Sequence, residues 1–422
     1  MSFPFRAGLA LLAAVPCLAF ADDAADLKAL RDEIATLRSS YEQRLQALEA
    51  RLQAAEAAKV AAPAPATPTA PPQAVAPAAP SPFGSPGTAT AGTGFNPAVS
   101  LILSGLYTRT SRDPQGFRFR NVPLPPDAEI GPGTRGFSLA ESELGLSANI
   151  DPWFRGVANI AFHPDNSVSV EEAYVQTTSL GNGFTVKAGR FFSGIGYLNA
   201  QHAHTWDFVD APLAYQAMLG TQFGDDGVQV AWLAPTDQFF ELRGELGRGR
   251  AYPGNSAGGN GAGSGALIAH TGGDIGESQS WRAGLSLLRA RASDQALDAL
   301  DAAGAPVTNA FTGTTRVWIA DGVWKWAPNG NATRTNFKLQ GEYLRGTREG
   351  TLVADAAGAA LAGAYRAVQA GWYVQGIYQF MPRWRVGLRT ERMDGGLPTF
   401  GGSTAALALD EGIARRNSLM LD

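Results

Sequence analysis

From Asn96 onward, apolar and polar residues alternate in segments of about 9 to 15 residues, which are separated by clusters of Gly, Pro, Asn and Asp. The clearest segment places Trp384, Val386 and Leu388 on one side and Arg385 on the other. Because successive side chains of a strand point to opposite faces, one face suits lipid and the other suits water and charge. The pattern predicts an all-β protein, a transmembrane antiparallel β-barrel.

About thirteen strands are predicted by this alternation, at residues 98–109, 136–150, 153–162, 168–179, 183–192, 227–234, 238–248, 280–290, 315–326, 335–346, 365–380, 382–393 and from 417. Bacterial single-chain barrels have an even strand number, and the sequence stops at Leu421-Asp422 without a terminal aromatic residue. We therefore expect about 14–16 strands in the complete protein, with C-terminal strands missing here.

The predicted connections alternate between short turns and long loops, as in barrels with periplasmic turns and extracellular loops. The long connections cover 110–135, 193–226, 249–279, 291–314, 347–364 and 394–416. Aromatic residues suited to interfacial girdles occur at strand ends, namely Tyr107, Trp153, Trp324, Trp326, Tyr378, Phe380 and Trp384. A soluble β-sandwich could also use these aromatics, but strand length and the charged alternate faces favour the barrel.

The first 95 residues predict three different segments. Residues 1–21 have a basic start, an apolar stretch and an Ala-Phe-Ala end, which is typical of a cleaved signal peptide. Residues 22–59 carry a seam of apolar residues at 3-4 spacing, which predicts an α-helical coiled-coil stalk in the periplasm that assembles a homotrimer. A single surface helix is the alternative. Residues 60–95 are rich in Pro and Ala and predict an extended linker, and residues 96–422 form the predicted barrel.

Composition narrows the class of partner. The net charge of -4 indicates no basic field for nucleic acid, and the one cysteine, Cys17, lies within the predicted signal peptide. No later segment has the roughly 20 consecutive apolar residues of a transmembrane helix, so residence in a lipid bilayer requires a barrel. These features favour the outer membrane of a Gram-negative cell.

The run Lys187-Ala188-Gly189-Arg190-Phe191-Phe192, followed by residues 193–212, resembles coiled-coil outer-membrane porins. The relatives are the phosphate-selective O/P-type and siderophore-porin families, some of them labelled zinc-regulated TonB-dependent outer membrane receptors. The resemblance implies passive or facilitated uptake of small solutes through a trimeric barrel. The residues before the first strand are too few for the plug domain of a gated receptor.

Candidate site residues fall into two groups. The pore-lining candidates are Arg190, Arg243, Glu245, Arg383, Arg385, Arg389 and Glu391, opposed by further lumen glutamates Glu141, Glu143, Glu171, Glu172, Glu241 and Glu342. Paired charges that brace the barrel are an alternative for these residues. The second group is a candidate Zn²⁺ site formed by His202, His204, Asp207 and Asp210, because imidazole and carboxylate are both zinc ligands. If zinc is not bound, we expect no cofactor, and these side chains would form hydrogen bonds with the barrel wall.

No catalytic motif is present, so the sequence predicts no enzyme. The favoured function is an outer-membrane porin whose 193–226 loop narrows the pore. The alternatives are a structural or adhesive barrel with a periplasmic tether, and a metal or siderophore uptake receptor.

Overall fold

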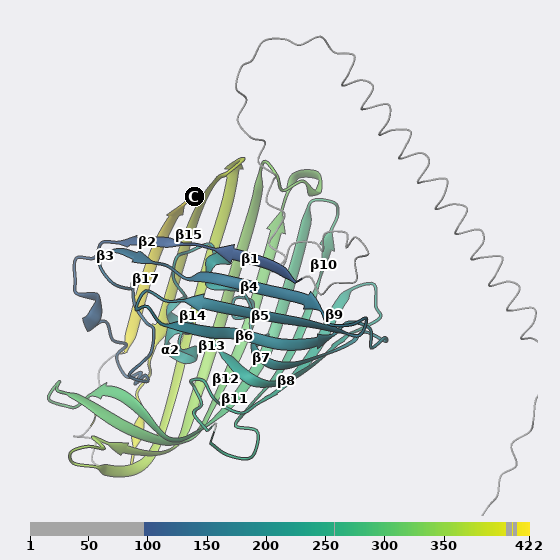
Figure 1. The fold of residues 1–422 in the computed structure, drawn as a ribbon. Helices are drawn as coiled ribbons and strands as arrows, with labels where there is room; N and C mark the ends of the chain where they lie inside the picture. The colour runs from purple at the N-terminus through teal and green to yellow at the C-terminus, as the bar shows by residue number, and fades with distance from the viewer. Residues whose placement is uncertain (1–96, 257, 402–406, 408–411) are drawn as a thin grey trace, which may run out of the picture. The chain divides into compact units, whose positions relative to one another are not determined.

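The computed structural model describes residues 97–256, 258–401, 407 and 412–422. The predicted signal peptide, coiled-coil stalk and linker lie outside the described residues. The described part is almost entirely antiparallel β-structure, as the alternation predicted (Figure 1).

One 15-stranded sheet forms the body of the protein. Its strands follow one another in chain order by antiparallel pairing, and they are β1 (Ala98–Ile102), β4 (Ser142–Asn149), β5 (Phe154–Phe162), β6 (Val168–Thr177), β7 (Phe184–Phe192), β8 (Gly224–Leu233), β9 (Phe239–Gly247), β10 (Ser264–Ile275), β11 (Gln279–Leu300), β12 (Pro306–Trp326), β13 (Asn336–Ala354), β14 (Leu361–Met381), β15 (Trp384–Asp394) and β17 (Ile413–Leu421). The short β16 (Thr399–Phe400) pairs with β14. A separate hairpin pairs β2 (Gly105–Thr108) with β3 (Gly136–Leu139).

Three details differ from the predicted strands. The segments 98–109 and 136–150 each divide into two strands, and β10 lies inside the predicted 249–279 loop. Strands β11 to β14 also continue through the predicted loops at 291–314 and 347–364 as two long hairpins. Strand β10 was missed because most of its residues are Gly, Ala, Ser or Thr, which give almost no alternation in hydrophobicity.

The sheet curls, as Figure 1 shows, but it does not close in the described residues. Strands β1 and β17 are the two ends of the pairing order, and no hydrogen-bonded register between them is present in the described part of the chain. The antiparallel sheet with consecutive pairing is therefore confirmed, whereas the closed barrel is not observed.

The outer face of the sheet carries two rows of aromatic residues, most of which are exposed. One row contains Tyr343 and Trp372, which are register partners, together with Trp318. The other contains Trp326, Phe337 and Tyr378, which are register partners across β12, β13 and β14, together with Phe380 and Trp384. Leu339, Val374 and Leu388 lie exposed between the rows.

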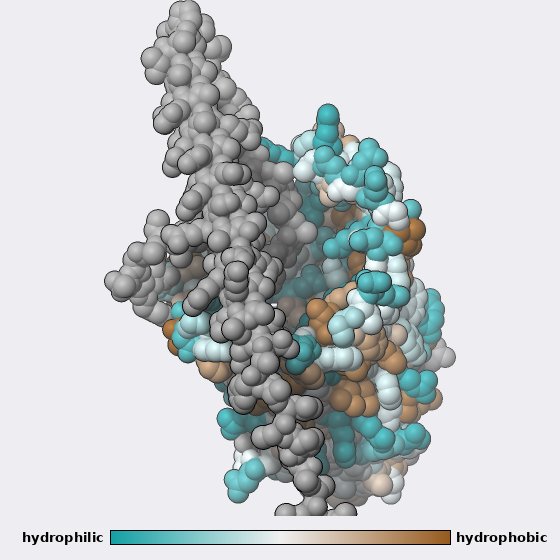
Figure 2. All heavy atoms as spheres, turned by 90° about the vertical axis from the view of Figure 1, so that its right-hand side faces the viewer, coloured by the Kyte–Doolittle hydropathy of each residue, from teal (hydrophilic) through white to brown (hydrophobic). Residues whose placement is uncertain are grey.

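Beyond the first row the outer face becomes basic. Arg289 pairs in register with Arg316, Arg345 with Trp318, and Arg392 with Trp372. The face seen in Figure 2 has apolar side chains gathered at mid-height, with hydrophilic ones above and below. The apolar region of the outer face is therefore a band with polar borders.

The inner face holds polar residues and an apolar core in the same wall. The α-helix on this face is α2 (Leu213–Leu219), a short helix that ends at Gly220 in the left-handed conformation. Short 3-10 turns lie at Pro114–Gly116, Ala203–Thr205 and Pro328–Gly330. Among the described residues, no helix combines the length and the apolar character needed to cross a membrane. Helix α2 lies against β14 and β15, and its side chains share one hydrophobic cluster with apolar residues of the inner face, which are Ile268, Leu288, Val317, Ile319, Leu344, Tyr373 and Met393.

Candidate functional site

The candidate site is built around residues 193–223, between β7 and β8, which we call the inner loop. It contacts both halves of the curled sheet. His202 lies against Glu143 of β4 and Glu171 of β6, while the backbone N–H of Leu213 donates to Glu391 of β15 at 2.6 Å. Because these strands lie far apart in the pairing order, the loop crosses the interior of the sheet. At the level of α2 its side chains are fully buried, so they fill that space.

Glutamates of the inner face hold the backbone of the inner loop. Glu245 of β9 accepts hydrogen bonds from the hydroxyl of Ser193 and from the N–H of Gly194. Glu342 of β13 accepts four: from the N–H groups of Tyr197 (3.2 Å) and Leu198 (3.0 Å), and from the hydroxyls of Tyr215 (2.7 Å) and Tyr373 (2.6 Å). Buried carboxylates require hydrogen-bond donors, and here the inner loop supplies donors to the glutamates of the wall.

Gly196 makes this approach possible. Its φ is +63°, and a Cβ built there would lie 2.3 Å from Oε2 of Glu342 and 2.7 Å from the Tyr215 hydroxyl. Any other residue would displace the carboxylate that organises the loop.

A second set of contacts joins the loop to a basic part of the wall. Asp207 lies 2.5 Å from Nζ of Lys338 and 3.4 Å from Nη1 of Arg385. Asp210 pairs with Arg389 and Arg416, which both also contact Glu391. Arg389 is 2% exposed, so its pairing is shielded from water.

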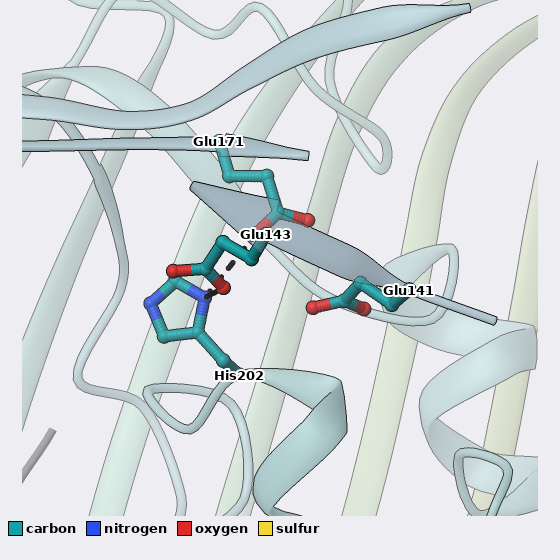
Figure 3. A group of neighbouring side chains, drawn as sticks. All are labelled: Glu141, Glu143, Glu171 and His202. Carbon is teal, nitrogen blue, oxygen red and sulfur yellow. Dashed lines mark hydrogen bonds and ion pairs between the residues drawn. The ribbon is translucent and has the colours of Figure 1, made fainter. Parts of the chain in front are cut away.

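On the opposite side lies what we call the His–Glu cluster, formed by Glu141, Glu143, Glu171, Glu172, His202 and His204. Figure 3 shows four of these residues, Glu141, Glu143, Glu171 and His202. Nδ1 of His202 is 2.9 Å from Oε2 of Glu143 and 3.2 Å from Oε2 of Glu171. Its Nε2 is 3.0 Å from Oε2 of Glu172. The His204 ring stacks on that of His202, with Nδ1 of His204 3.4 Å from Oε2 of Glu143.

A β-bulge brings two neighbouring glutamates into this cluster. In the β5–β6 register, Asn159 pairs with Glu172 and Ile160 pairs with Val170, so Glu171 is the extra residue. Strict alternation would send Glu171 and Glu172 to opposite faces. A bulge re-aims one side chain, and here both carboxylates meet His202.

The electrostatics of the cluster reflect its excess of carboxylates. Burial by itself lowers the pKa of His202, but the adjacent carboxylates of Glu143, Glu171 and Glu172 outweigh it and raise this pKa to about 12. Burial, followed by the charge of Glu171, raises the pKa of the Glu141 carboxyl to about 8. The arrangement therefore favours a positive charge at the position of His202.

Five of the predicted pore-lining residues lie on the inner face: Arg243, Glu245, Arg385, Arg389 and Glu391. Arg383 differs, because it occupies the exposed turn between β14 and β15 with a φ of +69°. Arg190 also differs, because it shares the outer face of β7 with exposed Phe184 and pairs with Asp226 at 2.6 Å. The alternation of β7 was the signal that could have placed Arg190 correctly.

The predicted metal set is split between the two sides of the inner loop. His202 and His204 lie together in the His–Glu cluster, whereas Asp207 and Asp210 lie against basic side chains on the other side. The carboxylates that do meet the histidines were identified in the sequence only as lumen charges. Nothing in the sequence alone relates them to His202, since the fold of the loop determines that contact.

Comparison with known proteins adds the following. No protein-family model matches the chain. An uncharacterized protein of Aquifex aeolicus (strain VF5) is 31% identical over 316 residues, 70% of this chain and 64% of that protein. The chain thus spans less than two thirds of the length of that curated relative.

Solved structures similar to the chain include outer-membrane proteins. The trimer form of OmpT, an outer membrane protein of Vibrio cholerae, has a TM-score of 0.36 at 11% identity, with 76% of this chain and 96% of that chain covered. The anion-selective porin from Comamonas acidovorans has a TM-score of 0.34 at 11% identity, with coverage of 77% and 98%. The outer membrane channel DcaP of Acinetobacter baumannii has a TM-score of 0.29 at 11% identity, with coverage of 77% and 96%. Similarity at this level establishes no function for this chain.

Proposed function

We propose that this protein is a channel of the bacterial outer membrane, in which the curled sheet forms the wall of a barrel and small solutes diffuse past the inner loop. The observation that carries the proposal is the pair of aromatic rows on the outer face. Trp318 and Trp326 of β12 lie eight residues apart, as do Trp372 and Phe380 of β14. That spacing is about 27 Å along a strand, and a tilt of about 40° reduces it to roughly 20 Å, close to the apolar band of about 25 Å in outer-membrane barrels.

The polar inner face supports transport over a purely structural membrane anchor. Charged residues of both signs line it, and a loop that carries its own charges is bound across it. Such a loop narrows a barrel and selects solutes by size and charge. We also propose a homotrimer held by the N-terminal coiled coil, with the stalk in the periplasm.

Planar-bilayer conductance of the full-length refolded protein tests the channel. The matched variant replaces residues 193–223 by a short Gly-Ser turn, which the fold permits because Phe192 and Gly224 are register partners. We expect conductance steps from the wild type, in groups of three for a trimer, and larger steps from the variant. Silence from both folded proteins would exclude a channel.

One observation favours a second candidate, a closed barrel with a structural role. The packing of α2 on Ile319, Leu344 and Tyr373 fills the interior at that level. A wild type that does not conduct, together with a loop-replacement variant that does, would identify this closed form.

A further inference from the structure

One part of the His–Glu cluster has the geometry of a metal site. The ligand atoms of Glu141, Glu143, Glu171 and His202 all lie within 4.8 Å of one another. Around a tetrahedral ion with bonds of about 2.1 Å, neighbouring ligand atoms are about 3.4 Å apart. The separations of 2.9 Å and 3.2 Å from Nδ1 of His202 to Glu143 and Glu171 are therefore close to those of a coordinated set.

A single ring proton does not satisfy these carboxylates. Nδ1 of His202 can carry one proton, but oxygens of both Glu143 and Glu171 converge on it. Glu143 is 5% exposed, and its Oε2, although close to the ring, has no hydrogen bond of acceptable geometry. Oε1 of Glu141 and Nδ1 of His204 are likewise buried without a hydrogen bond. Buried polar atoms in this state indicate a missing partner at their centre.

The charges point to a cation as that partner. Four carboxylates face two imidazoles, so carboxylates still outnumber the rings when both rings are protonated and the Glu141 carboxyl is neutral. In the part of the chain that the structure describes, the ion pairs of these four glutamates are made with His202 and His204. A divalent ion would balance the excess.

The second ring nitrogen of His202 has a carboxylate partner, as the non-coordinating nitrogen of a metal-binding histidine usually has. Nε2 of His202 lies 3.0 Å from Oε2 of Glu172, and Glu172 is itself fixed by the N–H of Phe192 and the amide of Asn159. A carboxylate at this position orients the ring so that Nδ1 faces the ion. The bulge at Glu171 serves both functions, because it supplies Glu171 as a ligand and Glu172 as the orienting group.

We propose that Nδ1 of His202 and the carboxylates of Glu141, Glu143 and Glu171 bind one Zn²⁺ ion, which fastens the inner loop to strands β4 and β6. Mixed imidazole and carboxylate ligands suit zinc, whereas Ca²⁺ takes six to eight oxygen ligands and is disfavoured by the nitrogen. Asp207 and Asp210 take no part. The site goes beyond the proposed channel function and does not depend on it.

Zinc binding to the untagged, full-length refolded protein tests the site by competition with a chromophoric chelator and by metal analysis after dialysis. We expect about one Zn²⁺ per chain in the wild type, and none in Glu143→Gln or Glu171→Gln. Glu172→Gln should bind zinc about 10- to 100-fold more weakly, because it changes only the orienting group. Asp207→Asn is the matched control from the same loop and should bind as the wild type does.

Zinc binding of a variant is scored only when heat-modifiable migration in gels shows that the protein is folded. Among the glutamate variants, Glu171→Gln changes the least buried side chain and so disturbs the wall least. A wild type that retains no zinc, or a Glu171→Gln protein that binds as tightly as the wild type, would overturn the proposal. Binding lost equally in Asp207→Asn would also overturn it. Because zinc is measured on folded protein without any conductance, a failed channel leaves this result unaffected.

Discussion

Glu342 offers the sharpest test of how the inner loop is held. The change Glu342→Gln keeps the side-chain shape but turns one carboxylate oxygen into an amide that cannot accept. Each oxygen of Glu342 accepts from one loop N–H and one tyrosine hydroxyl, so two of the four hydrogen bonds are lost. Hydrogen bonds to a charged group contribute about 1.5–3 kcal/mol each. One lost bond joins the loop in either orientation of the amide, and the second does so only when the amide replaces Oε2, because Tyr373 belongs to β14. The inner loop should therefore lose roughly 1.5–6 kcal/mol, which is about a 10- to 10⁴-fold increase in its opening equilibrium.

Amide hydrogen exchange in detergent micelles measures that opening. In Glu342→Gln the amides of Tyr197 and Leu198 should exchange faster by this factor, while amides of β13 keep their protection. The control is Glu349→Gln on the same strand, where Glu349 pairs with Arg316 and Arg366 in an exposed position worth about 0–1 kcal/mol. Unchanged exchange in Glu342→Gln, or an equal change in Glu349→Gln, would refute the anchoring role of Glu342.

Two further substitutions test the two faces of the wall. Arg389→Ala leaves Arg416 as the cation paired with Asp210 and Glu391, and should cost about 3–5 kcal/mol in urea unfolding. The more exposed Arg385→Ala should cost at most about 1 kcal/mol, and equal costs would contradict the buried pairing. Leu388→Arg places a charge between the aromatic rows and should cost about 2–4 kcal/mol in folding into lipid vesicles, with Leu388→Ala as the size control. If the arginine variant folds as well as the alanine variant, the outer face does not contact lipid.

The sequence predicted those strands in which large apolar side chains alternate with polar ones. Residues 384–393 alternate strongly, and β15 has the predicted faces. Strand β10 carries mostly small residues and was missed. One aromatic row, with Trp326, Phe380 and Trp384, was recognised because it ends predicted strands. The other, with Trp318 and Trp372, was not recognised, because β12 and β14 continue past it.

The site was less predictable because its contacts depend on loop conformation. The spacing of His202 and Asp207 along the chain suggested a shared site, yet the loop turns them toward opposite walls. The bulge at Glu171 breaks the two-residue period locally, so no periodicity argument could place Glu171 and Glu172 on one face. Long-range packing of the loop on the curled sheet decides both features.

The two sides of the inner loop differ in how they are held. Toward β13 to β15, backbone hydrogen bonds to Glu342 and Glu391 act together with the apolar packing of α2, so several kinds of interaction must fail for the loop to leave. Toward β4 and β6, the ion pairs of His202 and His204 are with carboxylates of one cluster, and the His202 ring also contacts the amide of Asn159 and the ring of Phe192. Charge interactions of this kind respond to the occupancy of a single ion, whereas packing does not. The proposed Zn²⁺ ion would therefore influence the inner loop most on the side of the His–Glu cluster, where charged contacts predominate.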